Sequence, residues 1–452
     1  MNKRFLQLIL CLGMIAMLTG CMFKSPDELY ALPELPEDYQ QLQVKLDEVM
    51  KELGAEYAAP LSGSNTATVQ LQDMDGDGYS ESTVAFFRVN SSESPLRIMI
   101  FRQRTDGVYE VRHVMEGDGN AIDSINYVDL DGDGTKDILV SWQISASVHT
   151  LTAYKIKLNE AVELVHTAYS ESFTILDLDR DNQQELLVVQ IDDTRENIDC
   201  VEYYDLVDGQ MVLAATAPIS AGADSVTAGG VRNGYLRDNI PALYLDVACG
   251  SIAVTDIYAV RDGMFTNITL DPVTGMSAET MRYYKEVSTQ DINKDGILEL
   301  PKPVQVPEDQ NQDTSNSWLI YWRQFDLNGN AYTVQINYHN LVDGWYLNIP
   351  ENWAGRITVR RDDTKSALGE RAVVFSLWNG DPEKTPQEFL RIYRLSGNNR
   401  TARAKLGNRF GLRERNNIIY AAEFQEIDWN CGLSRENLLE YFTIIQKEWS
   451  NQ

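Results

Sequence analysis

The stretch Asp129-Leu-Asp131-Gly-Asp133-Gly134-Thr-Lys-Asp137 places carboxylates on alternate residues and closes with a further acid at its ninth position. Oxygen ligands at positions 1, 3 and 5, with a residue at position 6 that tolerates left-handed backbone, suit a hard cation such as Ca²⁺. Carboxylates this close repel one another unless a cation lies among them. Three further nonapeptides repeat the pattern: Asp73-Met-Asp75-Gly-Asp77-Gly78-Tyr-Ser-Glu81, Asp177-Leu-Asp179-Arg-Asp181-Asn182-Gln-Gln-Glu185 and Asp291-Ile-Asn293-Lys-Asp295-Gly296-Ile-Leu-Glu299.

We number these acidic loops 1 to 4 in chain order and expect positions 1, 3, 5 and 9 of each to hold a structural calcium ion. An EF-hand would need a bidentate Glu at position 12 and a helix on each side. Apolar residues instead flank the loops, such as Tyr127-Val128 before loop 2 and Ile138-Leu139-Val140 after it. The residues at position 12 are Val84, Val140, Val188 and Lys302. The pattern therefore excludes an EF-hand and predicts strand, calcium turn, strand.

The spacing of the loops predicts a repeat architecture. Their first residues, at positions 73, 129, 177 and 291, fit units of about 48 to 57 residues, with one unit lacking its loop. Periods of roughly 40–50 residues with several short strands each are typical of propeller blades. The segment 228–247 is the expected position of the unit without a loop. We also expect no metal at Asp326-Leu-Asn328-Gly-Asn330, because its ninth position is Val334.

From about residue 66 to 342, the loops between strands resemble the FG-GAP/VCBS family of calcium-binding β-propeller repeats. The resemblance implies a mainly β fold, with a β-propeller of about five to seven blades, some of them degenerate. It is strongest for loops 1 and 2 and good for loop 3. It is weaker for loop 4, where Asn293 replaces an Asp and implies a lower affinity.

The amino terminus predicts export. Lys3 and Arg4 precede an apolar run over residues 5–18, and Leu18-Thr19-Gly20-Cys21 follows. This order is typical of a secretory signal peptide. Its ending resembles the lipobox of bacterial lipoproteins, which implies that Cys21 carries lipid, palmitate included, and becomes the new amino terminus. The alternatives are an ordinary signal peptide with a chance Cys, or an uncleaved membrane helix, for which a 14-residue run is short.

The expected location is therefore extracytoplasmic, on a lipid anchor in the cell membrane or an outer membrane. The formal net charge of -28 repels nucleic acid and anionic headgroups, so neither is an expected partner. Weak calcium sites also suit the outside of the cell, where extracellular modules work at ~10⁻⁴–10⁻³ M. Beyond Cys21, the cysteines Cys200, Cys249 and Cys431 remain; Cys200 and Cys249 either pair or stay as free thiols.

The sequence divides into four parts: a signal peptide over 1–21, a tether with an amphipathic helix over 22–62, the propeller over 63–342, and an α+β domain over 343–452. The helix carries one apolar stripe and ends near Gly54. We favour its docking on its own propeller over a coiled-coil partner. The stripe consists of Tyr39, Leu42, Leu46, Val49 and Leu53.

The C-terminal part is expected to pack one helix on an antiparallel sheet. Ser434 is the predicted N-cap of that helix, and Leu438, Phe442, Ile445 and Trp449 form its apolar face. Residues 352–418 are rich in Arg, which suits an anionic polymer such as teichoic acid, a dock for the acidic propeller, or a solvated sheet face. Tryptophans concentrate after residue 317 and suit either sugar stacking or a core. The segment 302–317 is expected to be a mobile loop.

The sequence carries no catalytic motif. His113, His149, His166 and His339 have no zinc spacing, and there is no nucleophile elbow or phosphate loop. We therefore expect a non-enzymatic binding or scaffold protein that contacts a protein or glycan ligand. The alternative is a polysaccharide-acting enzyme, a glycosidase or lyase, with two carboxylates in the propeller funnel.

Overall fold

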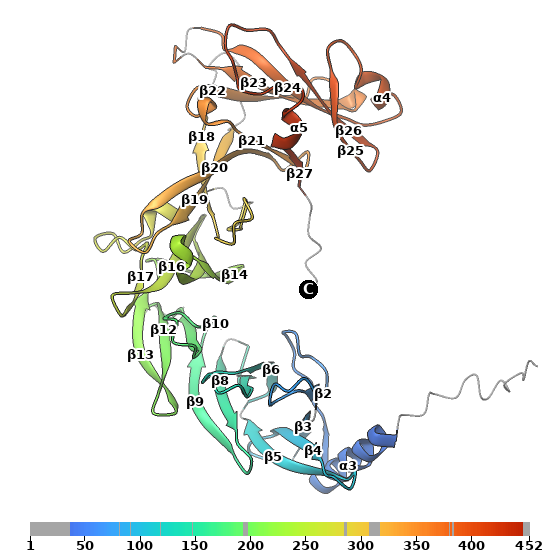
Figure 1. The fold of residues 1–452 in the computed structure, drawn as a ribbon, viewed down its shortest axis with the longest axis vertical. Helices are drawn as coiled ribbons and strands as arrows, with labels where there is room; N and C mark the ends of the chain where they lie inside the picture. Colours follow the sequence, from blue (N-terminus) through green and yellow to red (C-terminus); the bar gives the residue numbers. More distant parts are fainter. Residues whose placement is uncertain are drawn as a thin grey trace, which may run out of the picture. The chain divides into compact units, whose positions relative to one another are not determined.

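The structure is a computed structural model that describes residues 37–445, apart from 81, 91, 118, 147, 193–197, 284–286, 307–316, 379 and 382–383 (Figure 1). The predicted signal peptide with Cys21, the tether and the loop 1 residue Glu81 lie outside the described residues. The fold is mainly β and consists of several antiparallel sheets. Among the described helices, none combines the length and the apolar character that crossing a membrane requires.

The chain forms two compact units. The described part of the first comprises residues 37–59, 66–73 and 77–117. Its elements are helix α3 (Glu37–Leu53) and strands β1 (Ala55–Tyr57), β2 (Val69–Gln72), β3 (Ser82–Val89), β4 (Leu96–Gln103) and β5 (Tyr109–Gly117). Strands β2 to β5 pair in sequence order in one sheet, and the short strand β1 also pairs with β3.

Helix α3 packs on the sheet of its own unit. Leu42, Leu46 and Val49 are buried and form one core with residues of β3 and β4, including Phe87 and Phe101. These three residues of the predicted apolar stripe therefore pack on the chain's own sheet, in agreement with the prediction that the helix docks within the chain. Gly54 ends the helix at φ +59°, a left-handed conformation that glycine adopts readily.

The second unit comprises residues 60–65, 74–76 and 119–445. Its first four sheets are antiparallel, and within each the strands pair in sequence order. The first has β6 (Ala121–Val128), β7 (Asp137–Gln143), β8 (His149–Ile156) and β9 (Ala161–Tyr169). The second has β10 (Ser172–Leu176), β11 (Glu185–Gln190), β12 (Cys200–Val207) and β13 (Gln210–Pro218). The third has β14 (Ser225–Tyr235), β15 (Pro241–Cys249), β16 (Ile252–Arg261) and β17 (Met264–Asn267), and the fourth has β18 (Leu300–Gln305), β19 (Trp318–Phe325), β20 (Ala331–Asn340), β21 (Trp345–Asn348) and β27 (Phe442–Ile444).

Successive sheets of this unit pack face to face. Leu186 and Val188 lie in a core with β7 and β8, whereas Leu187 and Val189 lie in a core with β15 and β16. Alternate residues of a strand point to opposite faces. The unbroken apolar run of β11 therefore follows from burial on both of its faces. The sheet β14–β17 occupies the place of the unit without an acidic loop, and residues 236–240 join its first two strands.

The last sheet has the strand order β22-β23-β24-β26-β25. It packs on the sheet β18–β21 through one core that includes Trp345, Trp353, Phe375 and Phe389. The pairing of β20 with β21 runs across residue 343, where the sequence predicts a boundary. The strands are β22 (Ile357–Asp362), β23 (Glu370–Leu377), β24 (Gln387–Leu395), β25 (Phe410–Arg415) and β26 (Ile418–Phe424). The short helical turns of the unit are η1 (Arg237–Asn239), η2 (Ala278–Thr280), η3 (Glu351–Trp353), η4 (Ser366–Leu368), α4 (Arg400–Arg403) and α5 (Leu438–Tyr441).

Two sequence predictions about this region are wrong. The final helix spans only Leu438–Tyr441, and Asn437, not Ser434, is its N-cap. Phe442 instead begins β27, which pairs with β21, so sheet pairing overrides the helical spacing that continued to Ile445. Trp449 lies outside the described residues. The start of the predicted mobile segment 302–317 is wrong, because its residues up to Gln305 pair with β19, and residues 307–316 of the segment lie outside the described residues.

Candidate metal sites

The acidic loops join strands, as the sequence predicts. Loop 1 connects β2 with β3, loop 2 connects β6 with β7, and loop 3 connects β10 with β11. Loop 4 leads directly into β18 and is closed by an isolated bridge between Gln290 and Glu299. No helix borders any of the four loops in the described chain, in agreement with the exclusion of an EF-hand.

The backbone of the loops is left-handed at two positions. Position 6 has φ between +71° and +90° (Gly78, Gly134, Asn182 and Gly296), as the sequence predicts. Position 4 is left-handed as well, with φ between +65° and +74° (Gly76, Gly132, Arg180 and Lys294). In loops 1, 2 and 4, the N–H of position 6 donates to the carboxylate of position 1 at 2.9 Å. The first Asp thus fixes the turn while its carboxylate stays inside the loop.

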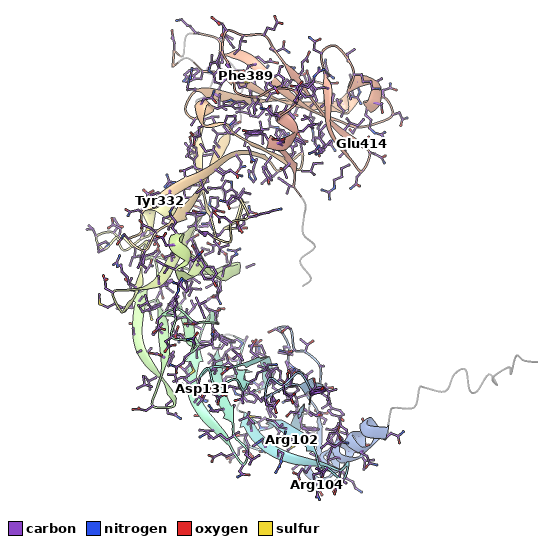
Figure 2. All side chains as sticks on the ribbon, viewed as in Figure 1. Arg102, Arg104, Asp131, Tyr332, Phe389 and Glu414 are labelled. Atoms are coloured by element: carbon purple, nitrogen blue, oxygen red, sulfur yellow. The ribbon has the colours of Figure 1, made fainter. Side chains whose placement is uncertain are left out.

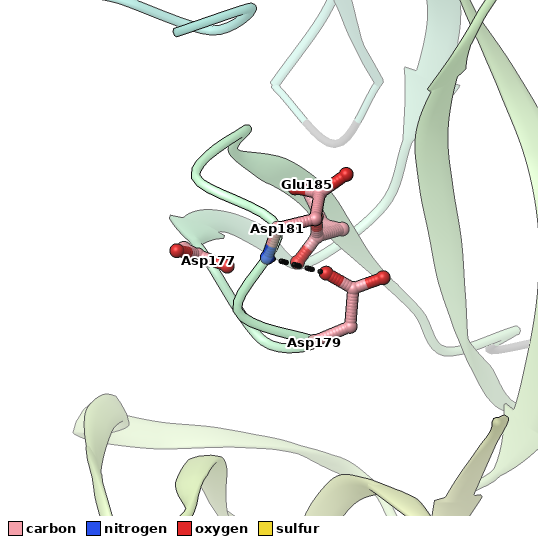
Figure 3. A group of neighbouring side chains, drawn as sticks. All are labelled: Asp177, Asp179, Asp181 and Glu185. Carbon is pink, nitrogen blue, oxygen red and sulfur yellow. Dashed lines mark hydrogen bonds between the residues drawn. The ribbon is translucent and has the colours of Figure 1, made fainter.

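The carboxylates of each loop converge. In loop 3, all four predicted ligands, Asp177, Asp179, Asp181 and Glu185, offer oxygens within 4.8 Å of one another (Figure 3). Asp181 also donates its backbone N–H to Asp179 at 3.2 Å. The other groups are Asp73, Asp75 and Asp77 in loop 1, Asp129, Asp131 and Asp137 in loop 2, and Asp291, Asp295 and Glu299 in loop 4. These four groups could hold a metal ion.

Two predicted ligands are arranged differently. Asp133 does not belong to the group of loop 2, although its place in the repeat predicts the same ligand role as that of Asp131. Asn293 turns its amide toward its own loop, where its Oδ1 accepts the N–H of Asp295 at 3.0 Å and its Nδ2 donates to Asp295 Oδ2 at 2.9 Å. An amide with these bonds is a weaker ligand than a carboxylate.

The acid at position 9 is buried in all three loops where it is described. Asp137, Glu185 and Glu299 are each 0% exposed. One oxygen of each accepts the N–H of position 2, at 3.1, 2.5 and 2.8 Å. The second oxygen has no hydrogen-bond partner in Asp137 and Glu185, and Asp131 Oδ1 is likewise without one (Asp131 is labelled in Figure 2).

Unpartnered buried oxygens are costly, and a bound cation would satisfy them. The donor set consists of oxygens, without a His or Cys in any of the groups. Such a set suits Ca²⁺ or Mg²⁺ rather than Zn²⁺ or copper. The residues present therefore fit the predicted calcium.

Burial also changes the protonation of these acids. It raises the pKa of Glu185 from 4.5 to about 8, and the charges of Asp179, Asp177 and Asp181 add to the shift. Burial likewise raises the pKa of Asp137 and of Glu299 to about 7. Without a cation, loops 2, 3 and 4 therefore each carry a carboxyl that binds a proton near neutral pH.

Neighbouring loops are hydrogen-bonded to one another. The N–H of position 8 donates to the carbonyl of position 2 in the preceding loop, from Lys136 to Met74 at 2.7 Å and from Gln184 to Leu130 at 2.9 Å. A Cβ on Gly132 would lie 2.6 Å from the carbonyl oxygen of Asn182, so position 4 of loop 2 requires glycine for close approach as well as for φ. No pattern in the sequence predicts this contact between loops.

Counting the segment before each loop as the first strand, which for loop 4 is only the bridged Gln290, a residue on the third strand also acts on loops 2, 3 and 4. The Lys155 ammonium bonds both Asp131 and Asp133, the latter at 2.7 Å. This bond is the main reason that the pKa of Asp133 falls to about 2. In loop 4, Gln324 Nε2 donates to Asp295 Oδ2 and to Glu299 Oε1, both at 2.7 Å. In loop 3, burial is the main cause that raises the pKa of Asp179, and the charge of Asp181 comes next. The charge of Asp205 also raises this pKa.

In the metal-free protein, we expect the melting temperature to fall as pH rises from 5 to 9. Glu185 binds a proton more tightly in the folded chain than in the unfolded chain, where its pKa is near 4.5. Its contribution is therefore intact at low pH and is lost as pH rises to about 8. Glu185→Gln, which stays neutral at every pH, should flatten the fall in a calorimetric pH series.

Glu160→Gln is the matched control, because Glu160 is exposed in the hairpin between β8 and β9. It should leave the pH profile of the wild type unchanged. Identical profiles for Glu185→Gln and the wild type would contradict the assignment of a buried, proton-binding carboxyl to loop 3.

The basic residues of the C-terminal part are largely paired with acids. Arg391 forms ion pairs with Glu388 at 2.8 Å and Asp362 at 3.1 Å. Arg409 pairs with Glu370 at 2.9 Å, and its guanidinium lies over the ring of Tyr393. These contacts lie within the last sheet and leave these arginines less available to an anionic polymer.

The aromatic and sulfur residues have structural roles. Trp142, Trp322, Trp345 and Trp353 are at most 1% exposed, so these tryptophans are core residues rather than platforms for sugar rings. Cys200 and Cys431 are free thiols. Of the two alternatives for Cys200 and Cys249, the structure therefore shows the one without a disulfide between them.

No protein-family model matches the chain, and no curated protein matches it. Among solved structures, an exotype rhamnogalacturonan lyase, YesX, is 14% identical over 75% of this chain and 70% of that chain, with a TM-score of 0.31. A functionally unknown protein from Desulfotomaculum acetoxidans DSM 771 is 10% identical over 71% of this chain and 84% of that chain, with a TM-score of 0.28. TM-scores this low establish no common fold and carry no argument about function.

Proposed function

We propose that the chain is a lipid-anchored, calcium-stabilised surface protein that binds a protein or glycan ligand without turning it over. The observation that carries this proposal is the recurrence of converging carboxylates in four loops, each of which leads into a strand of a different antiparallel sheet. A repeated device of this kind stabilises a scaffold, and it does not by itself provide a catalytic pair.

Calcium would be held by the acids at positions 1, 3, 5 and 9 of the loops, most completely by Asp177, Asp179, Asp181 and Glu185. It would supply positive charge to oxygens that have no partner within the chain. Because the loops form only in the folded protein, calcium binding adds to the free energy of unfolding.

The proposal includes the β-propeller of the FG-GAP/VCBS type and the anchor at Cys21. Antiparallel sheets with strands in sequence order, packed one on the next, support the propeller. The lipobox-like sequence before Cys21 supports the anchor and an extracytoplasmic location. The negative charge makes nucleic acid an unsuitable partner.

One cavity favours the alternative of a polysaccharide-acting enzyme. It has a volume of about 400 Å³ in the second unit, and Asp123, Glu171 and Tyr169 are among its lining residues. Two carboxylates beside an aromatic ring are the groups that glycoside hydrolysis uses. Glu171 accepts the N–H of Val226 at 3.1 Å, and Asp123 accepts the Ser141 hydroxyl at 3.3 Å.

Incubating the purified, calcium-loaded protein with cell-wall glycans and with detergent-extracted surface proteins tests the proposal. We expect retention of a ligand on the immobilised protein and no release of new reducing ends or unsaturated sugars. Release of such products, abolished by Asp123→Asn or Glu171→Gln, would instead establish the enzyme. Retention of neither class of ligand, with no product, would reject both functions.

A further inference from the structure

Lys155 and Gln324, which contact loops 2 and 4 from the third strand counted in this way, occupy one equivalent position, and Asp205 occupies it beside loop 3. The first residue after loops 2, 3 and 4 pairs with Tyr154, Tyr204 and Arg323, respectively. Each of these residues lies on a strand that also pairs with the next strand along the chain. In that second pairing, the register shifts immediately before each of the three residues. The next residues along the strands are therefore equivalent: Lys155, Asp205 and Gln324.

In loop 2, this position supplies a positive charge. The Lys155 side chain is 18% exposed, and its ammonium bridges Asp131 and Asp133. An ammonium that bonds the acids at positions 3 and 5 competes with a divalent cation for the same oxygens. It also accounts for the separation of Asp133 from the other acids of the loop.

In loop 4, the position supplies a neutral donor. Gln324 is 3% exposed; its Nε2 donates to Asp295 and to Glu299, and its Oε1 accepts a hydrogen bond from Arg237 at 3.3 Å. An amide opposes a cation less than an ammonium on the acids themselves does, although the Arg237 guanidinium beyond it adds a positive charge.

In loop 3, the position supplies a negative charge. Asp205 cannot donate a hydrogen bond when ionised. Its Oδ1 accepts the N–H of Leu206 at 2.7 Å, and its place in the strand is equivalent to that of Lys155. Glu185 Oε1 is completely buried and without a partner, as are two oxygens of loop 2, but no described ion pair neutralises the acids of loop 3. Loop 3 therefore offers a cation the most negative charge.

We propose that this third-strand residue sets the divalent-cation affinity of its loop, and that the order of affinity is loop 3, then loop 4, then loop 2. The inference rests on the proposed calcium binding. It moves loop 2 from first to last in the order expected from the loop sequences, in which loop 2 matches the pattern better than loops 3 and 4. The acids of loop 2 match the repeat better than those of loops 3 and 4, but two of them form ion pairs with Lys155.

Calcium titrations followed by hydrogen exchange and mass spectrometry give a midpoint for each loop separately. Lys155→Gln, which copies the residue of loop 4, should lower the calcium midpoint of loop 2 by about tenfold or more, because one opposing charge is removed. Asp205→Asn should raise the midpoint of loop 3 by about threefold or more. Gln324→Lys should raise the calcium midpoint of loop 4, because the new ammonium would compete with calcium for the acids of loop 4 as Lys155 does in loop 2.

Lys157→Gln and Asp208→Asn are the matched controls. They make the same charge changes at exposed positions close to Lys155 and Asp205 in the sequence. Asp208 has φ +52°, which Asn tolerates. Both controls should leave the midpoints of all loops within a factor of about two.

The outcomes separate this inference from the function on which it rests. If no loop of the wild-type protein gains protection with calcium, the proposed calcium binding fails. If the wild type binds but each variant matches its control, calcium binding stands and the role of the third-strand position is wrong. If Lys155→Gln does not fold, the expected weakening of loop 4 in Gln324→Lys decides the inference.

Discussion

Removal of calcium with a chelator is expected to lower the melting temperature of the purified protein, and excess calcium is expected to restore it. A ligand that binds only the folded state at 100 times its dissociation constant adds about 2.7 kcal/mol per site. For domains of 150–250 residues, 1 kcal/mol corresponds to about 2–4 °C. Two occupied loops would therefore shift the transition by roughly 10 °C or more.

The reason for this large effect is the burial of the acids at position 9. Glu185 and Asp137 each keep an oxygen without a hydrogen-bond partner inside the protein. Differential scanning calorimetry with EDTA, with calcium and with magnesium measures the shift. The double variant Asp177→Asn/Glu185→Gln should show a smaller calcium response, because loop 3 loses two charges. An unchanged melting curve after verified metal removal would contradict the structural role.

Replacement of Trp353 by Ala is expected to destabilise the C-terminal part by about 3–5 kcal/mol. The side chain is 0% exposed and its ring lies 4.8 Å from that of Phe389 and 5.7 Å from that of Phe375. Its indole N–H donates to the Cys431 carbonyl at 2.6 Å. The substitution therefore leaves a cavity and removes a bond that holds the segment before α5. Urea unfolding followed by tryptophan fluorescence and circular dichroism measures the loss.

Two comparisons make the Trp353 prediction specific. Trp353→Phe keeps most of the apolar volume and loses the bond to Cys431, so it should cost less than the Ala variant. Trp378→Ala removes the same side chain from a half-buried position and should also cost less. Equal losses for Trp353→Ala and Trp378→Ala would show that Trp353 has no special place in this core.

The sequence predicted well those features that depend on neighbouring residues. The strands around loops 2 and 3 follow from apolar residues next to the acids, and helix α3 follows from its stripe of Leu and Val. The left-handed backbone at position 6 follows from Gly134 and from Asn182. Each of these features is encoded within a few residues of where it occurs.

Features that depend on distant residues could not be predicted in this way. Lys155 lies 24 residues after Asp131, and nothing in the acidic pattern indicates which third-strand residue reaches the loop. The end of the last helix depends on the pairing of Phe442 with Leu347, far away in the chain. The left-handed backbone at Arg180 and Lys294 also has no signal, since neither residue type favours it.

The hydrogen bond from Gln184 to Leu130 makes loops 2 and 3 mechanically dependent on each other. Leu130 also donates its own N–H to Asp137, so an ordered loop 3 holds a residue that positions the buried acid of loop 2. Such nearest-neighbour contacts give a linear array cooperative behaviour. The sheet β14–β17 has no acidic loop and interrupts this relay. We therefore expect loop 4 to respond to calcium as an isolated element and loops 2 and 3 to respond together.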